Sequence, residues 1–277
     1  MRKKTAIILV TALVIVGALG FGAWKGYEWF IARMTPNACY LQVQGVEEPL
    51  RLTNEQARNA SIIVAESYNR GLSEQAAVIA LATAWQESGL RNLNYGDRDS
   101  LGLFQQRPSY DWGTEEQIMD PWYSSGRFYE ELIKFENWES TDVNDIAQKV
   151  QRSGHPEAYR KHETNARALA GAFRGSREGT FTCINRDASG TDRSVLDKVV
   201  AAVPGVSLQN NGSDLTMTAN DADSAWSVTH LAIANATDLG IEKVSVGGNE
   251  WKQGERTWKD VQPVSGNSVT VTMKLRS

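Results

Sequence analysis

The feature that most constrains this chain is a run of uncharged, mostly apolar residues that fills positions 5–24. A helix of that length rises about 30 Å, which is the thickness of the hydrocarbon core of a bilayer. The three residues before the run, at positions 2–4, are Arg-Lys-Lys, and such basic flanks stay in the cytoplasm. We therefore predict a cytoplasmic tail over 1–4 and a single transmembrane anchor over 5–24. The bulk of the chain is then extracytoplasmic, held at the cell membrane.

A cleaved signal peptide is the alternative for the same run. Signal peptides have a shorter apolar region that ends in a small-residue cleavage site. Here the run is long, and Trp24, Tyr27 and Trp29 follow it where an interfacial aromatic belt is expected. These features favour an uncleaved signal-anchor. A single span does not build a transporter or a channel.

The two cysteines suit an exported chain. Cys39 and Cys183 are the only cysteines, so in an oxidising compartment they are the only available pair. Their spacing is not that of a metal or redox motif, while two free buried thiols are the remaining alternative. We predict a Cys39–Cys183 disulfide.

The charge balance and the absence of certain motifs exclude several classes of partner and cofactor. The chain has 29 basic and 33 acidic side chains and a formal net charge of −4, which gives no electrostatic footprint for nucleic acid. Its three histidines have no metal-binding spacing, and no glycine-rich phosphate-binding motif occurs. We expect no nucleic-acid partner, no metal and no cofactor.

Patterning after the anchor predicts an α+β protein with two domains. Residues 25–50 form a linker, and 51–175 form a mainly helical domain that starts at the capping box Thr53-Asn-Glu-Gln56. Residues 176–192, rich in Gly, Ser, Arg and Asp, predict a second linker. Residues 193–277 predict a small α+β domain in the order α-β-β-α-β-β.

Individual elements follow from periodicity and from helix stop signals. In the helical domain, helices are predicted over 53–71, 73–89, 115–135, 143–151 and 156–173. In the C-terminal domain, helices are predicted over 194–203 and 221–239, a hairpin around 210–212, and strands over 241–246 and 269–275.

Two short motifs carry the chemistry. The first is Ala84-Trp-Gln-Glu-Ser-Gly-Leu90, and the second is Ser100-Leu-Gly-Leu-Phe-Gln-Gln106. Glu87 falls at the end of a predicted helix, where partial burial and the negative helix terminus both disfavour a charged carboxylate. A carboxylic acid that stays protonated near neutral pH suits general acid catalysis. The alternative is that Glu87 merely finishes a surface helix.

These motifs resemble those of the lysozyme-like soluble lytic transglycosylases, a superfamily that also includes the goose-type lysozymes. Glu87-Ser88 matches the Glu-Ser pair that ends a helix in that family, and Gly102-Leu-Phe-Gln105 matches the following glutamine motif. The 18 positions from Glu87 to Gln105 are the family's usual interval. The resemblance covers about 51–173 and implies a lysozyme-like domain that cleaves the glycan strands of peptidoglycan.

The resemblance also implies roles for single residues. Glu87 would protonate the glycosidic oxygen, and in a lytic enzyme it would then take the proton of the sugar's C6 hydroxyl, leaving a 1,6-anhydro product. Gln105 would contact the sugar near the cleavage point, Phe104 would help wall the groove, and Ser88 would also be a substrate-binding residue. This route needs one catalytic carboxylate, whereas ordinary hydrolysis usually uses two.

The sequence departs from the family at two places. Many lytic members carry a serine about nine positions after the glutamate, where this chain has Gly96. Asp97 or Asp99 is a candidate to position a water for hydrolysis, and the alternative is that both only fold the turn through side-chain-to-backbone bonds. In the third family motif Gln151 replaces a tyrosine, and Tyr159 is the candidate to supply the missing ring.

Other aromatic residues leave two interpretations open. A cluster of aromatic residues follows the glutamine motif: Tyr110, Trp112, Trp122 and Tyr123. Their rings would either stack on sugar or fill the core, and the sequence favours neither role. The atypical third motif likewise leaves a non-catalytic alternative, a lysozyme-like protein that binds glycan or scaffolds a cell-envelope assembly. An envelope protein could then bind through the C-terminal domain, an expectation by analogy only.

Overall fold

A computed structural model describes residues 17–18, 20–27, 30, 36–152, 157–186, 192–261 and 269–275. The chain divides into two compact units, residues 1–36 and residues 37–277. In the first unit, the described residues 17–18, 20–27 and 30 are helical. Among the residues described, the structure has no helix with the length and apolar character needed to cross a bilayer. The transmembrane helix in the expected fold class is therefore corrected, and positions 5–16 and 19 of that run lie outside the described residues.

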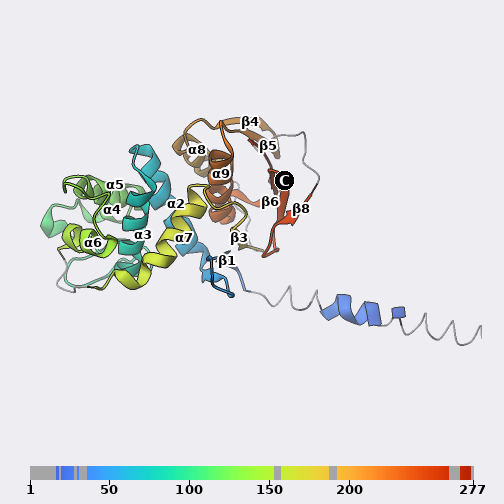
Figure 1. Cartoon of the computed structure of the whole chain (residues 1–277), viewed down its shortest axis with the longest axis horizontal. Helices are drawn as coiled ribbons and strands as arrows, with labels where there is room; N and C mark the ends of the chain where they lie inside the picture. The colour runs from blue at the N-terminus through green and yellow to red at the C-terminus, as the bar shows by residue number, and fades with distance from the viewer. Residues whose placement is uncertain are drawn as a thin grey trace, which may run out of the picture. The chain divides into compact units, whose positions relative to one another are not determined.

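The second unit begins with two short strands and continues into a helical body, residues 54–173 (Figure 1). Its longest helices are α2, Asn54–Asn69, and α3, Glu74–Ser88. The capping box is confirmed, since the Thr53 side chain accepts from the backbone of Gln56 and the Gln56 side chain accepts from the backbone of Thr53. The remaining helices of the body are α4 Glu115–Ile118, α5 Pro121–Leu132, α6 Val143–Gln151 and α7 Glu163–Phe173, with 3-10 turns at Pro108–Tyr110 and Arg160–His162.

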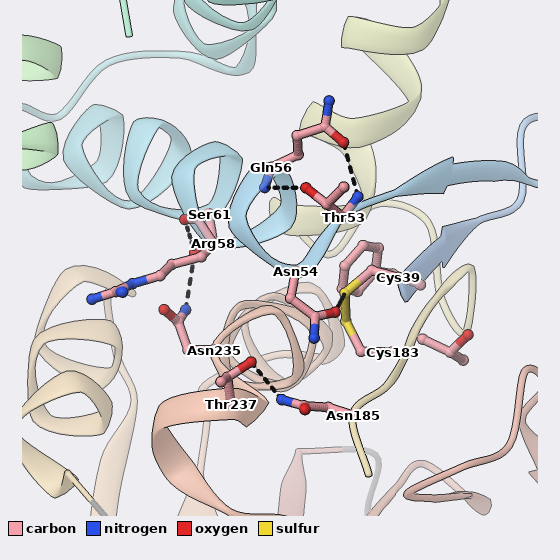
Figure 2. Close-up of a disulfide and its surroundings, with 12 residues drawn as sticks. Cys39, Thr53, Asn54, Gln56, Arg58, Ser61, Cys183, Asn185, Asn235 and Thr237 are labelled. Atoms are coloured by element: carbon pink, nitrogen blue, oxygen red, sulfur yellow. Dashed lines mark hydrogen bonds between the residues drawn. A yellow bond between two sulfur atoms is a disulfide. The ribbon is translucent and has the colours of Figure 1, made fainter. Parts of the chain in front are cut away.

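A small antiparallel sheet contains both cysteines. Its strands are β1 Ala38–Leu41, β2 Leu50–Leu52 and β3 Phe181–Ile184, in the order β2-β1-β3. Cys39 lies directly opposite Cys183 in the ladder of β1 and β3, and the two form a disulfide, as predicted (Figure 2). Both stretches expected to be linkers, 25–50 and 176–192, thus contribute strands to this sheet. Strands β1 and β3 are buried along their whole length, so they carry no alternating pattern that sequence could reveal.

The C-terminal part places helices against a larger antiparallel sheet with the strand order β4-β5-β9-β6-β7-β8. The helices are α8 Arg193–Ala202, α9 Ala222–Ala234 and α10 Ala236–Leu239. The strands are β4 Ser207–Asn211, β5 Asp214–Thr218, β6 Ile241–Val246, β7 Asn249–Lys252, β8 Lys259–Asp260 and β9 Thr270–Leu275. The predicted hairpin is confirmed as β4–β5, and the α+β character of this part is confirmed with two further strands, β7 and β8.

Helix α9 joins the C-terminal part to the helical body. It packs on α2 and α7 as well as on β6 and β9 (Figure 1). Ser227 Oγ donates to Phe173 O at 2.7 Å, and His230 Nδ1 lies 2.8 Å from Ala172 O. The buried apolar core therefore runs without interruption from the helical body into the larger sheet.

Candidate functional site

Glu87 is half-buried at the C-terminal end of α3. The helix stops because Gly89 adopts the left-handed conformation, with φ 65°, and donates from its N–H to Trp85 O. Almost every residue of α3 before this point is buried, which fixes the direction in which the helix end points. The predicted helix terminus at Glu87-Ser88 is confirmed.

The structure brings Tyr159 to Glu87. The phenol oxygen of Tyr159 donates a hydrogen bond of 2.7 Å to Oε1 of Glu87. The ring of Tyr159 is fully buried, and its backbone N–H donates to Asn144 Oδ1 at 3.2 Å. A buried ring has little freedom to move, so it holds the carboxyl group of Glu87 in one orientation.

Ser88 joins the end of α3 to the glutamine motif. Its hydroxyl, 4% exposed, lies 2.7 Å from Leu103 O and 3.0 Å from Ala84 O. The motif itself is a tight loop closed by paired backbone hydrogen bonds between Leu101 and Gln106. Ser88 thus sets the distance between the helix end and the loop, rather than lying free beside a substrate.

Phe104 contributes through its backbone. Its ring is 1% exposed and stacks on the ring of Phe128, with centroids 4.7 Å apart, so it belongs to the core. Its carbonyl oxygen accepts a hydrogen bond of 2.9 Å from Gln151 Nε2, at the end of α6. Gln151 therefore holds the loop at the residue that follows the one held by Ser88.

Gln105 projects from the loop at a left-handed backbone position, with φ 48°. Its amide nitrogen lies 3.3 Å from both Tyr95 O and Gly102 O. A Cβ built on Gly96 would lie 1.9 Å from Gln105 Oε1 and 2.6 Å from Ser100 O. The departure from the serine of the resembled family thus has a physical reason here, because the side chain of Gln105 occupies that space.

The two aspartates of the loop differ. Asp97 is exposed, with its nearest cation, Arg98 Nε, 4.0 Å away. Asp99 accepts from the backbone N–H of Ser109 at 2.9 Å and from Arg107 Nε at 2.6 Å. Hydrogen bonds from Ser109, and then from Arg107, hold the pKa of Asp99 well below its usual range. The contacts of Asp99 therefore fit the role of folding the turn, rather than that of positioning a water.

Sequence reasoning missed a histidine close to the site. His162 Nε2 lies 3.2 Å from Gln86 Oε1, and its ring stacks on Trp85 with centroids 6.0 Å apart. Burial, with a smaller contribution from Lys161, lowers the pKa of His162. The i, i+3 spacing from Tyr159 was the available signal, since residues three apart on a helical turn face the same way.

The aromatic cluster does not act as one surface. Tyr110 is 53% exposed and carries the guanidinium of Arg107 over its ring at 4.4 Å. Trp112 packs partly against the core. Trp122 lines a separate cavity, at the start of α5.

Comparisons with known proteins give no family assignment. No protein-family model matches this chain, and no curated protein matches it. The likeness to lysozyme-like enzymes therefore rests on the residues of the two motifs and on their arrangement.

Proposed function

We propose that this protein cleaves the glycan strands of peptidoglycan, with Glu87 as the general acid. The observation that carries the proposal is the hydrogen bond from the buried Tyr159 to Oε1 of Glu87. The Glu87 carboxyl group is half-buried, is oriented by a fixed phenol and lies at the helix end that holds the loop carrying Gln105. A carboxylic acid in such a setting is suited to protonate a glycosidic oxygen.

In the proposed reaction, Glu87 gives its proton to the glycosidic oxygen as the bond from that oxygen to the anomeric carbon breaks. The resulting carboxylate then accepts the proton of the C6 hydroxyl, whose oxygen bonds to the anomeric carbon and closes a 1,6-anhydro ring. The engagement of Asp99 with Arg107 and Ser109 makes it a poor second carboxylate for hydrolysis, whereas Asp97 stays exposed in the same loop, so the product decides between the two routes.

The disulfide supports an extracytoplasmic location. Disulfides persist in oxidising compartments and are rare in the cytosol, and Cys39–Cys183 closes the fold around the helical body. Peptidoglycan lies in such a compartment, so substrate and enzyme would meet there.

The test is digestion of isolated peptidoglycan with product analysis by mass spectrometry. We expect 1,6-anhydro ends with the wild-type chain and a loss of at least about a hundredfold in Glu87→Gln, the size of effect typical of removing a general acid. Glu242→Gln, on β6 in the larger sheet, is the matched control and should cleave like wild type.

Reducing ends in place of anhydro ends would support hydrolysis by the same acid. If no product depends on Glu87, the proposed activity is wrong. Co-sedimentation with peptidoglycan in that case would identify a non-catalytic glycan-binding protein.

A further inference from the structure

A cavity of about 600 Å³ lies between the helical body and the C-terminal part. Residues of α2, the start of α5, α8 and α10 line it. None of the residues around Glu87 is in its lining. Its volume falls in the range of about 300–1,000 Å³ usual for small-molecule sites, which often form where two parts of a fold meet.

Two buried side-chain amides line the cavity. Asn59, 4% exposed, donates from Nδ2 to Leu90 O at 2.9 Å. Asn235, 2% exposed, donates from Nδ2 to Ser61 Oγ at 2.9 Å and to Leu231 O at 2.8 Å (Figure 2). Asn92 is also in the lining, and within the described part of the chain its buried Oδ1 atom receives no hydrogen bond, although buried polar atoms are normally paired.

Carboxylates at the rim each use one oxygen locally. Asp120 Oδ1 caps α5 through the N–H of Trp122, and Asp192 Oδ1 caps α8 through the N–H of Ser194. Glu55 Oε1 accepts from the N–H of Asn92 at 3.1 Å. The second oxygen of each carboxylate remains able to accept a hydrogen bond from a ligand.

Trp122 supplies an aromatic surface beside these acceptors. Its ring is half-buried at the start of α5, and Lys198 Nζ lies 5.8 Å from the ring centroid. Arg58 Nε pairs with Asp238 Oδ2 at 3.2 Å in the same lining. Cations of the protein therefore already offset part of the carboxylate charge, which favours a neutral ligand rich in hydroxyl groups over an amine.

We propose that this cavity binds a short neutral oligosaccharide. Sugar hydroxyls donate to planar amide and carboxylate oxygens, while the C–H face of a sugar ring packs on an aromatic ring. We expect N-acetylated sugars to be preferred, and this expectation rests on the proposed function. The saccharide site itself rests only on the lining of the cavity.

The test is an NMR titration of the full chain with triacetylchitotriose, followed through the tryptophan indole N–H signals. The Trp122 signal, assigned from the spectrum of Trp122→Phe, should shift with saturation. Trp122→Ala lacks this reporter, so its binding is measured by titration calorimetry, and its dissociation constant should be about tenfold higher than that of wild type. Val195→Trp, which fills the cavity from α8 without removing a polar partner, should abolish binding there, and Trp138→Phe, outside the lining, should leave it unchanged.

Glu87→Gln separates the two proposals, because it should leave the response of Trp122 intact. If Trp122 responds while wild-type chain releases no glycan product, the proposed function fails and the saccharide site stands. An unmoved Trp122 signal overturns the site, as does unchanged binding in Val195→Trp. A response to the peptide Ala-Lys-Ala but not to the sugar would overturn it in favour of a cation-binding cavity.

Discussion

Tyr159 and Glu87 are 72 positions apart in sequence and meet through one hydrogen bond. Nothing local to either residue dictates the contact, because α6 and the turn at Arg160–His162 must first pack on α3. In the proposed reaction, this hydrogen bond orients the carboxyl group of Glu87. A carboxyl group held by a rigid donor loses less conformational freedom when a substrate binds.

Replacing Tyr159 with Phe tests this contact, because it removes the hydroxyl while keeping the ring. We expect glycan release to fall about tenfold, since a positioning hydrogen bond contributes on the order of 1 kcal/mol, and stability to change by a similar amount. Turbidity loss of a peptidoglycan suspension measures the rate. Tyr110→Phe, at an exposed ring, is the control, and equal rates in wild type and Tyr159→Phe would contradict the assigned role.

His230 makes the fold sensitive to acid. Burial lowers the pKa of His230 to about 4, from 6.5 in an unfolded chain. The unfolded state therefore binds more protons between these values, so stability is full above pH 6.5 and is lost as the pH falls towards 4. The expected loss is about 3 kcal/mol in the free energy of unfolding. Urea unfolding at pH 7 and pH 4 measures it, and in His230→Gln the difference between the two pH values should shrink by that amount.

At the scale of elements, the site depends on how the end of α3 holds the loop 93–106. Ser88 of α3 holds the loop through Leu103 O, and Gln151 of α6 holds it through Phe104 O. Further bonds run from α2 to the residues just after the helix, with Gln56 Nε2 donating to Gly89 O at 2.9 Å and Asn59 Nδ2 to Leu90 O. The geometry around Glu87 is therefore a product of three helices.

Gly96→Ala tests the inner packing of this loop. The added methyl group would meet Gln105 Oε1 and the backbone oxygen of Ser100, so Gln105 must move. We expect glycan release to fall more than tenfold while the far-ultraviolet circular dichroism spectrum of the helices stays unchanged, because a displacement of about 1 Å at a positioning residue can cost that much. Wild-type activity in Gly96→Ala would show that the position of Gln105 is not needed.

At the scale of the whole molecule, β1 and β3 bring the start of the helical body next to the segment that follows α7. The Cys39–Cys183 bond closes a loop with a sequence separation of 144, which encloses every helix from α2 to α7. Residues of α9 share one buried core with residues of α2 and α7. We therefore expect a substitution that destabilises the C-terminal part to destabilise the helical body as well.

The double variant Cys39→Ser/Cys183→Ser tests the contribution of the disulfide. In the chain-entropy model, a loop of this length stabilises the fold by roughly 4–5 kcal/mol. We expect urea unfolding to show that loss, and thiol labelling of the denatured, non-reduced wild-type chain to find no free thiol. Two reactive thiols per chain would refute the bond.

The sequence by itself determined the local structure of this protein. The capping box at Thr53, the helix end at Glu87 and the hairpin around Gly212 were all predictable, because each depends on neighbours within a few residues. The cysteine pairing was predictable for another reason, since two cysteines allow only one bond.

Only the tertiary structure decided what lies far apart in sequence. It paired Tyr159 with Glu87, engaged Asp99 with Arg107, buried the ring of Phe104, and turned parts of two expected linkers into strands. It also overturned the membrane span expected over 5–24 as far as the described residues extend. The physical reason is common to these cases: periodicity reports which face of an element is apolar, whereas the identity of the partner depends on packing that no local pattern encodes.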